Sequence, residues 1–133
     1  ANETLLQTFL FVLEFEQMKN DAKPQINIIS MASREVFASK QFNRLLQVIM
    51  HLGNYMNGNT ARGDAPGFKL NSLNKINDTK STDNKQTLLK FLVEQVSRQD
   101  ESLLNWPEDL KNLSAARRVA LSQLGLDIGQ MKI

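Results

Sequence analysis

Apolar residues between positions 42 and 56 recur at the spacing of one face of an α-helix. They stand three, four, seven, ten and fourteen positions after the first of them. The set is Phe42, Leu45, Leu46, Ile49, Leu52 and Met56. A period near 3.6 residues is typical of a helix that buries one face. The sequence therefore predicts a central core helix here, with Met56 in its buried face.

The rest of the chain carries the same helical period and no alternation typical of strands. A first helix is predicted from Glu3 to about Lys19, with Leu6, Phe9, Leu10 and Leu13 on its apolar face. Pro24 is predicted to break the chain before a second helix over 24–38, because proline lacks a backbone donor and disfavours helical geometry in the residue before it.

Further helices are predicted after residue 67. They are a short helix in 68–76, a helix over 83–97 capped by Ser81 or Thr82, a short helix opening at Pro107, and a last helix from Ser114 to the chain end. The fold class predicted is all-α, an elongated helical bundle with one long irregular loop around residues 57–69. Glycine, asparagine and proline dominate 57–67, as in turns.

Length and composition favour one domain over 1–133. Hydrophobic residues make up 41% and charged residues 23% of the 133 residues, enough apolar material for one core. No run approaches the roughly 18 apolar residues that a membrane span needs. Cysteine is absent and no secretory leader begins the chain, which suits a cytoplasmic protein.

The net charge of +2 is concentrated in one segment. Residues 57–90 carry six basic and three acidic residues, whereas the segments on either side are nearly balanced. A local positive surface favours an acidic partner, whether protein, nucleic acid or phosphate.

The residues needed for catalysis are few. His51 is the one histidine, so neither a histidine triad nor a multi-histidine metal site can be built. The run "GNTARG" lacks the Lys-Ser/Thr ending of a phosphate-binding loop and follows a helix instead of a strand. We therefore expect no enzyme, no catalytic residue, no metal and no cofactor.

Two other functions fit the same composition. A helical scaffold or adaptor module would use its apolar stripe to bind another protein. A weak nucleic-acid binder would use the basic segment 57–90, although Phe68 is the only aromatic residue there that could stack on a base.

The stretch "LGNYMNGNTARGDAPGFKLNSLNKINDTKSTDNKQTLLKFLVE" closely resembles the signature region of the second formin homology domain. The Gly-Asn-aromatic-Met-Asn start, Arg-Gly-x-Ala-x-Gly-Phe, Asp-Thr-Lys-Ser and Thr-Leu-Leu appear in the family's order. One position departs from the pattern, since the family usually has glycine where Asn59 stands. Asparagine tolerates left-handed backbone, so the turn should survive.

The resemblance covers essentially the whole chain but only part of the family's domain. It implies the post, the part that receives the other subunit, with a portion of the adjoining helical bridge; the lasso, linker and knob are absent. In the family, two subunits form a ring that nucleates actin filaments and stays on the barbed end during elongation. The implied partners are actin and a second formin subunit, with no nucleic acid and no membrane, in the cytoplasm and cytoskeleton.

The resemblance also implies two sets of site residues. Gly53, Asn54, Tyr55, Met56 and Asn57 correspond to positions where the post receives the partner's lasso. Lys80 corresponds to a lysine that contacts actin, and Arg62, Lys69 and Lys75 would extend the positive surface beside it.

Overall fold

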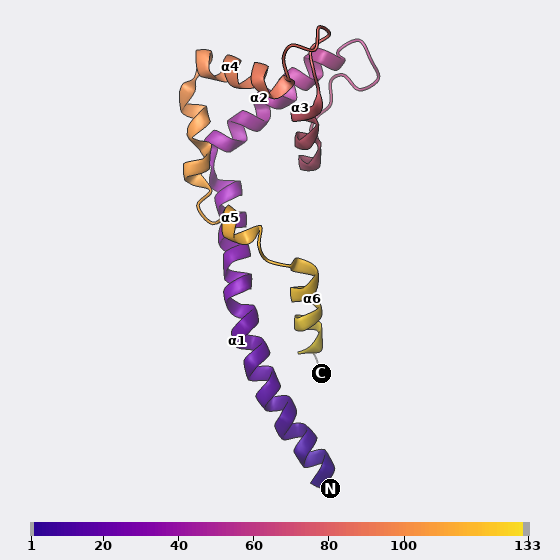
Figure 1. The fold of residues 1–133 in the computed structure, drawn as a ribbon, viewed down its shortest axis with the longest axis vertical. Helices are drawn as coiled ribbons and strands as arrows, with labels where there is room; N and C mark the ends of the chain where they lie inside the picture. The colour runs from indigo at the N-terminus through magenta and orange to yellow at the C-terminus, as the bar shows by residue number, and fades with distance from the viewer. Residues whose placement is uncertain (1, 132–133) are drawn as a thin grey trace. The chain divides into compact units, whose positions relative to one another are not determined.

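A computed structural model describes residues 2–131, and the regular secondary structure of these residues is helical (Figure 1). Within this range there is no strand, only an isolated bridge between Lys80 and Thr87. The α-helices are α1 (Asn2–Ala38), α2 (Lys40–Asn57), α3 (Asn74–Asp78), α4 (Leu88–Gln99), α5 (Leu113–Ala116) and α6 (Leu121–Gln130). Two 3-10 helices are η1 (Leu70–Leu73) and η2 (Glu101–Asp109). The all-α prediction is confirmed, as is the irregular loop, which occupies 58–69.

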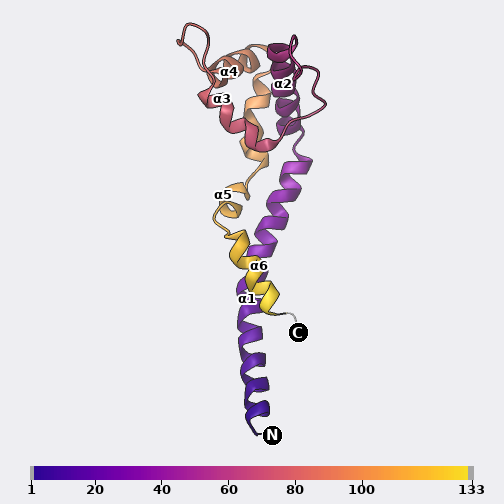
Figure 2. The ribbon, with the colours of Figure 1, turned by 90° about the vertical axis from the view of Figure 1, so that its right-hand side faces the viewer.

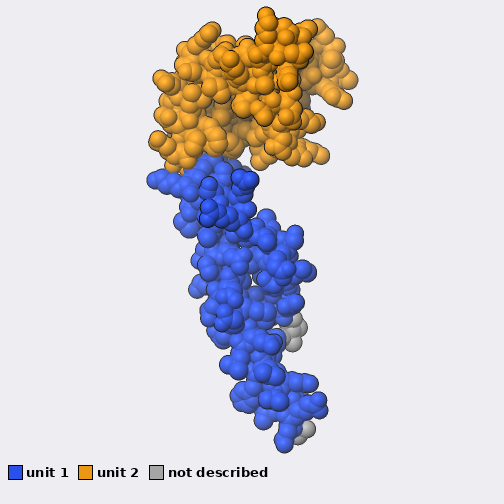
Figure 3. All heavy atoms as spheres, in the orientation of Figure 1, with its two compact units in different colours: residues 1–37, 110–133 blue, residues 38–109 orange. Residues whose placement is uncertain are grey.

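The chain divides into two compact units (Figure 3). Unit 1 comprises residues 1–37 and 110–133, and unit 2 comprises residues 38–109. The expectation of a single domain over 1–133 stays a prediction.

In unit 1, α1 runs without interruption through Pro24, so the predicted break between two helices is wrong (Figures 1 and 2). An interior proline removes one helical hydrogen bond and costs about 3 kcal/mol. Ala22 and Ala32, on either side of the proline, are both buried. Both alanines lie in the same uninterrupted helix of 37 residues, in which the missing bond affects only the turn at Pro24. The cost of the proline is therefore confined to one turn, and the hydrogen bonds of the other turns keep the helix continuous.

The predicted apolar face of the first helix is present but open to solvent. Its side chains are between 49% and 69% exposed. They are Leu6, Phe9, Leu10 and Leu13. Helical period predicted the face correctly but did not determine whether it is covered.

The predicted last helix is two short helices. Within unit 1, α5 ends at Ala116, and the N–H groups of Arg118 and Val119 donate to carbonyls only three residues earlier. Such i to i+3 bonds tighten and end a helix. The second piece, α6, starts after Ala120, whose backbone is not helical. The predicted continuous helix capped by Ser114 is therefore wrong.

The core of unit 2 lies where α2 and α4 pack against η2. Leu92, Val96 and Leu103 are buried there. Half-buried side chains surround them, namely Leu45, Val48, Ile49, Leu52 and Leu104. No residue of α2 is itself fully buried, and Met56 is 52% exposed. The placement of Met56 in the core is therefore wrong, because the last turn of α2 extends beyond the buried cluster.

The first turn of α2 is fixed by Ser39, which is buried. Its hydroxyl oxygen accepts a hydrogen bond from the Phe42 N–H at 3.1 Å and donates to the Asp109 carboxylate at 2.6 Å. Beside it, the Phe42 and Trp106 rings lie 5.4 Å apart between centroids. The helix predicted to open at Pro107 instead begins at Glu101, and Pro107 lies inside it.

Candidate binding surface

The last turn of α2 carries the motif "GNYMN" and ends in two local hydrogen bonds, one from a side chain and one from the backbone. The Asn57 Nδ2 donates to the Gly53 carbonyl at 2.9 Å, and the Gly58 N–H reaches the Tyr55 carbonyl at 3.4 Å. The helix ends here because asparagine and glycine give the backbone alternatives to further helical bonds.

The first half of the 58–69 loop folds onto the Asn57 carbonyl. That oxygen accepts from the Thr60 N–H at 2.8 Å and from the Thr60 hydroxyl at 2.9 Å. The loop passes so close that a Cβ added to Gly63 would lie 2.8 Å from the same oxygen. Glycine is needed at this position because of close approach, not because of a positive φ.

The second half of the loop is tied to α2 by Asn54. Its Nδ2 donates to the Ala65 carbonyl at 3.0 Å, and its Oδ1 accepts from the Ala65 N–H at 2.9 Å. One side chain thus satisfies both backbone groups of one loop residue. The adjacent Asp64 has a left-handed backbone, with φ of 54°.

A second, smaller turn separates Lys80 from α4. The Ser81 N–H donates to the Gln86 carbonyl at 2.8 Å beside the Lys80–Thr87 bridge. This pairing keeps 81–86 out of the helix, so α4 starts at Leu88 and Thr87 caps it by accepting from the Lys90 N–H at 3.2 Å. The prediction of a helix from residue 83 capped by Ser81 or Thr82 is therefore wrong.

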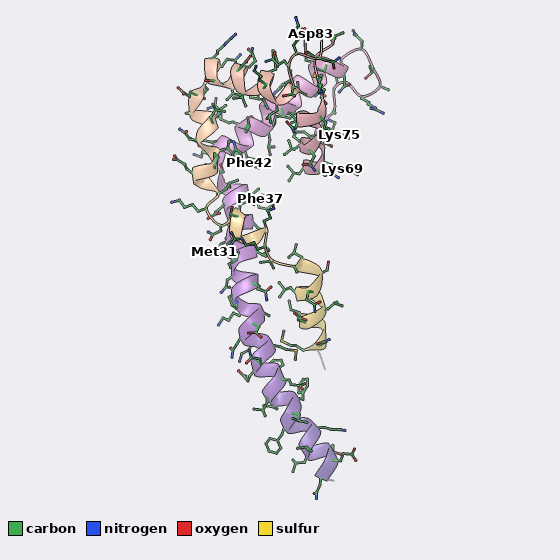
Figure 4. All side chains as sticks on the ribbon, viewed as in Figure 1. Met31, Phe37, Phe42, Lys69, Lys75 and Asp83 are labelled. Atoms are coloured by element: carbon green, nitrogen blue, oxygen red, sulfur yellow. The ribbon has the colours of Figure 1, made fainter. Side chains whose placement is uncertain are left out.

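Asp83 organises this turn (Figure 4). Its carboxylate accepts a 2.5 Å bond from the Ser81 hydroxyl and a 3.2 Å bond from the Lys85 N–H. These hydrogen bonds, the Ser81 bond most strongly, lower the pKa of the Asp83 carboxyl below its ordinary value because they favour the charged form.

A cavity of about 590 Å³ lies within unit 2, between α2, the loop, η1, α3 and α4. Its apolar lining comes from all of these elements and includes Ile49, Leu52, Met56, Phe68, Leu73, Ile76, Leu88 and Leu92. Arg62 and Lys75 also line it, so an apolar hollow carries two cationic side chains. A hollow of this size and composition suits an apolar or aromatic group that has acidic neighbours.

The five residues expected to receive the lasso fall into two groups. Gly53, Asn54, Met56 and Asn57 line the cavity. Tyr55 does not line it, and its side chain stands 86% exposed. A tyrosine this exposed does not contribute to the core.

The four expected actin-binding cations are all exposed. Arg62 and Lys75 line the cavity, and Lys80 lines a second hollow of about 130 Å³ that also touches Met56. Lys69 lies immediately before η1 and lines neither; Figure 4 labels Lys69 and Lys75. Among the described residues, none of the four forms an ion pair. Their charge is therefore available to a partner.

Sequence reasoning missed the residues that shape the cavity. Ala65, Leu73, Ile76, Thr79 and Leu88 were not predicted to belong to a site, yet all line it. Phe68, the only aromatic residue of the basic segment, was the one available signal. The others are four apolar residues and one threonine, which the fold brings together.

The part of the chain that the structure describes has no group of side chains suited to holding a metal ion. No three histidine, cysteine, aspartate or glutamate side chains gather there. The exposed His51 places Nδ1 2.8 Å from the Gln47 carbonyl, and since a carbonyl can only accept, Nδ1 carries the proton. None of the described helices is both long and apolar enough to cross a bilayer.

Comparison with known proteins agrees with the motif. The family model for the Formin Homology 2 Domain matches residues 3–133. The chain belongs to the formin homology 2 family. The resemblance seen in the sequence is thereby confirmed, and the cavity-lining motif belongs to a formin homology 2 chain.

Relatives come from distant organisms. Formin-A of Dictyostelium discoideum is 40% identical over 96% of this chain and 10% of its own length. Protein diaphanous homolog 3 of Homo sapiens is 41% identical over 95% of this chain and 11% of its own. Formin-like protein 6 of Oryza sativa subsp. japonica is 38% identical over 92% and 9%. The formin homology 2 chain thus spans about a tenth of these relatives.

Proposed function

We propose that this formin homology 2 chain is a non-enzymatic, actin-binding part of a formin and acts as the post. The observation that carries the proposal is the 590 Å³ cavity, lined by Gly53, Asn54, Met56 and Asn57 together with the cationic Arg62 and Lys75. Binding energy alone is then its means of action, since it favours one arrangement of actin subunits over others.

The cavity is the proposed receiving site for a second formin subunit. An inserted indole of the partner's lasso would be covered by Leu52, Met56 and Leu73. Burial of one aromatic side chain typically supplies about 2 to 3 kcal/mol, and buried aromatic anchors dominate many interfaces. The small Gly53 leaves open space, because no atom from beyond its own stretch of helix lies within 4 Å of where its Cβ would stand.

The exposed cations are the proposed actin contacts. Lys80, Lys75, Lys69 and Arg62 have no acidic partner of their own within residues 2–131, so binding an acidic filament breaks no ion pair. Complementary charge of this kind speeds encounter and orients the partner. In the complete dimer, this contact would serve nucleation and processive elongation at the barbed end, in the cytoskeleton.

The proposal is tested by Lys80→Ala in a complete formin homology 2 domain that contains these residues. Lys40→Ala is the matched control, because Lys40 is also exposed but is the first residue of α2, whereas the motif of the binding surface lies in the last turn of that helix. We expect slower pyrene-actin assembly and weaker filament co-sedimentation for Lys80→Ala only, with unchanged helical circular dichroism. Equal behaviour of both variants would refute the role of Lys80. A domain that stays in the supernatant at every concentration would indicate a scaffold for another protein.

A further inference from the structure

The Asn54 side chain forms its two hydrogen bonds within the molecule. Its oxygen and its nitrogen bond the Ala65 N–H at 2.9 Å and the Ala65 carbonyl at 3.0 Å, across eleven residues of chain. Both residues are half-buried, so these bonds are partly shielded from water. A pair of hydrogen bonds with fixed geometry holds a loop more firmly than one bond to solvent-exposed groups.

The loop that this pair holds is a wall of the cavity. Arg62, Ala65, Gly67 and Phe68 all line the cavity, and all belong to 58–69, which has no regular structure of its own. The near half of the loop is held separately by Thr60 on the Asn57 carbonyl. The far half, with Phe68, has the Asn54 pair as its side-chain link to α2 among the described residues.

We propose that Asn54 is a positioning residue, which clamps Ala65 so that the far half of the loop forms one wall of the cavity. It acts through the loop, whereas Met56 from the same motif faces the occupant. The motif "GNYMN" then combines anchors and contacts: Asn54 and Asn57 bind backbone, Met56 lines the cavity, and Tyr55 is exposed to solvent. This inference rests on the proposed use of the cavity as a receiving site and changes the role first assigned to Asn54.

The clamp can be tested with Asn54→Asp in the 133-residue chain. At neutral pH the introduced carboxylate has no donor for the Ala65 carbonyl and repels its oxygen, which separates the two residues and exposes the Ala65 N–H to water. A protonated carboxyl group both donates and accepts, as the amide does, so acid should restore the pair. Asn59→Asp is the matched control, because Asn59 is exposed in the same loop and has no side-chain hydrogen bond among the described residues.

Two measurements report on the clamp and on the cavity separately. Amide hydrogen exchange at Ala65, without any ligand, should be about tenfold faster in Asn54→Asp at pH 7 than in the native chain. Binding of N-acetyltryptophanamide, followed by NMR signals of Met56 and Phe68, should weaken by a similar factor. Both effects should shrink as pH falls below about 4, near the ordinary range of an aspartate.

The outcomes separate the clamp from the proposed function. Unchanged Ala65 exchange in Asn54→Asp, or an equal change in Asn59→Asp, overturns the clamp. Faster exchange with unaltered probe binding overturns the positioning role. Faster Ala65 exchange together with weaker probe binding, both reversed by acid and seen in Asn54→Asp alone, supports the inference. That result would stand even if a second formin subunit is later found to bind elsewhere.

Discussion

Glu35 and Asn112, separated by 77 positions in the chain, form a two-bond pair in unit 1. One carboxylate oxygen accepts from the Asn112 N–H at 2.9 Å, and the other accepts from its Nδ2 at 2.6 Å. Both residues are half-buried. The pair joins the end of α1 to the segment that leads into α5, which no local pattern could have predicted.

Replacing this carboxylate should destabilise the protein. Glu35→Ala leaves two donors of Asn112 without a partner, which costs about 1 to 3 kcal/mol in the free energy of unfolding. Glu35→Gln should lose less, since one amide oxygen still accepts. Urea unfolding measures both, with Glu14→Ala as the control because Glu14 is exposed and unpaired in the described residues. Equal stability of Glu35→Ala and Glu14→Ala would contradict the importance of the pair.

Ser39→Ala removes two interactions at once in unit 2. The cap on the Phe42 N–H and the bond to Asp109 are both lost, so we expect about 1 to 3 kcal/mol of destabilisation. Ser33→Ala is the comparison, since Ser33 is exposed within α1. The thermal midpoint should fall in Ser39→Ala and stay unchanged in Ser33→Ala. An equal fall in both variants would contradict the importance of the two hydrogen bonds that Ser39 makes.

Two glycines of the loop should respond oppositely to alanine. At Gly63 the added methyl group meets the Asn57 carbonyl at 2.8 Å and the Gly58 Cα at 3.1 Å, so the loop must shift. At Gly67 nothing lies within 4 Å and φ is not positive, so alanine should be neutral or add about 0.4 to 1 kcal/mol by restricting the unfolded chain. Loop amide chemical shifts and urea midpoints distinguish them. A stable, unshifted Gly63→Ala variant would contradict the close approach.

The turn at Asp83 should titrate below the ordinary range of an aspartate. Its carboxyl pKa is lowered in the folded state, chiefly by the Ser81 hydroxyl, so the stabilisation is present above the unfolded pKa. It is lost as pH falls through the folded pKa. Carboxyl-carbon NMR titration should show the Asp83 pKa rising toward its usual value in Ser81→Ala. Thr82→Ala is the control, because no side-chain hydrogen bond joins Thr82 to the Asp83 carboxylate among the described residues. The Asp83 pKa should be the same in this variant as in the native chain, and an unchanged Asp83 pKa in Ser81→Ala would disprove the assigned cause.

The amino-acid sequence by itself determined the helical class, the irregular loop and the family. Helical period, turn-forming residues and the ordered motifs are local properties of the chain, and each acts within a few residues. The packing of Leu45, Ile49 and Leu52 against the core was predicted on the same grounds, since their spacing does not depend on any partner.

Only the tertiary structure decided where helices continue, where they start and which residues line the site. Pro24 lies inside an uninterrupted α1, because one missing bond does not end a helix of 37 residues, and α4 begins late because Lys80 pairs with Thr87. Asn54 could be recognised as part of a motif, but its bond to Ala65 depends on where the loop returns. Contacts between residues distant in the chain carry no period, so they become visible only once the backbone has brought them within hydrogen-bonding distance.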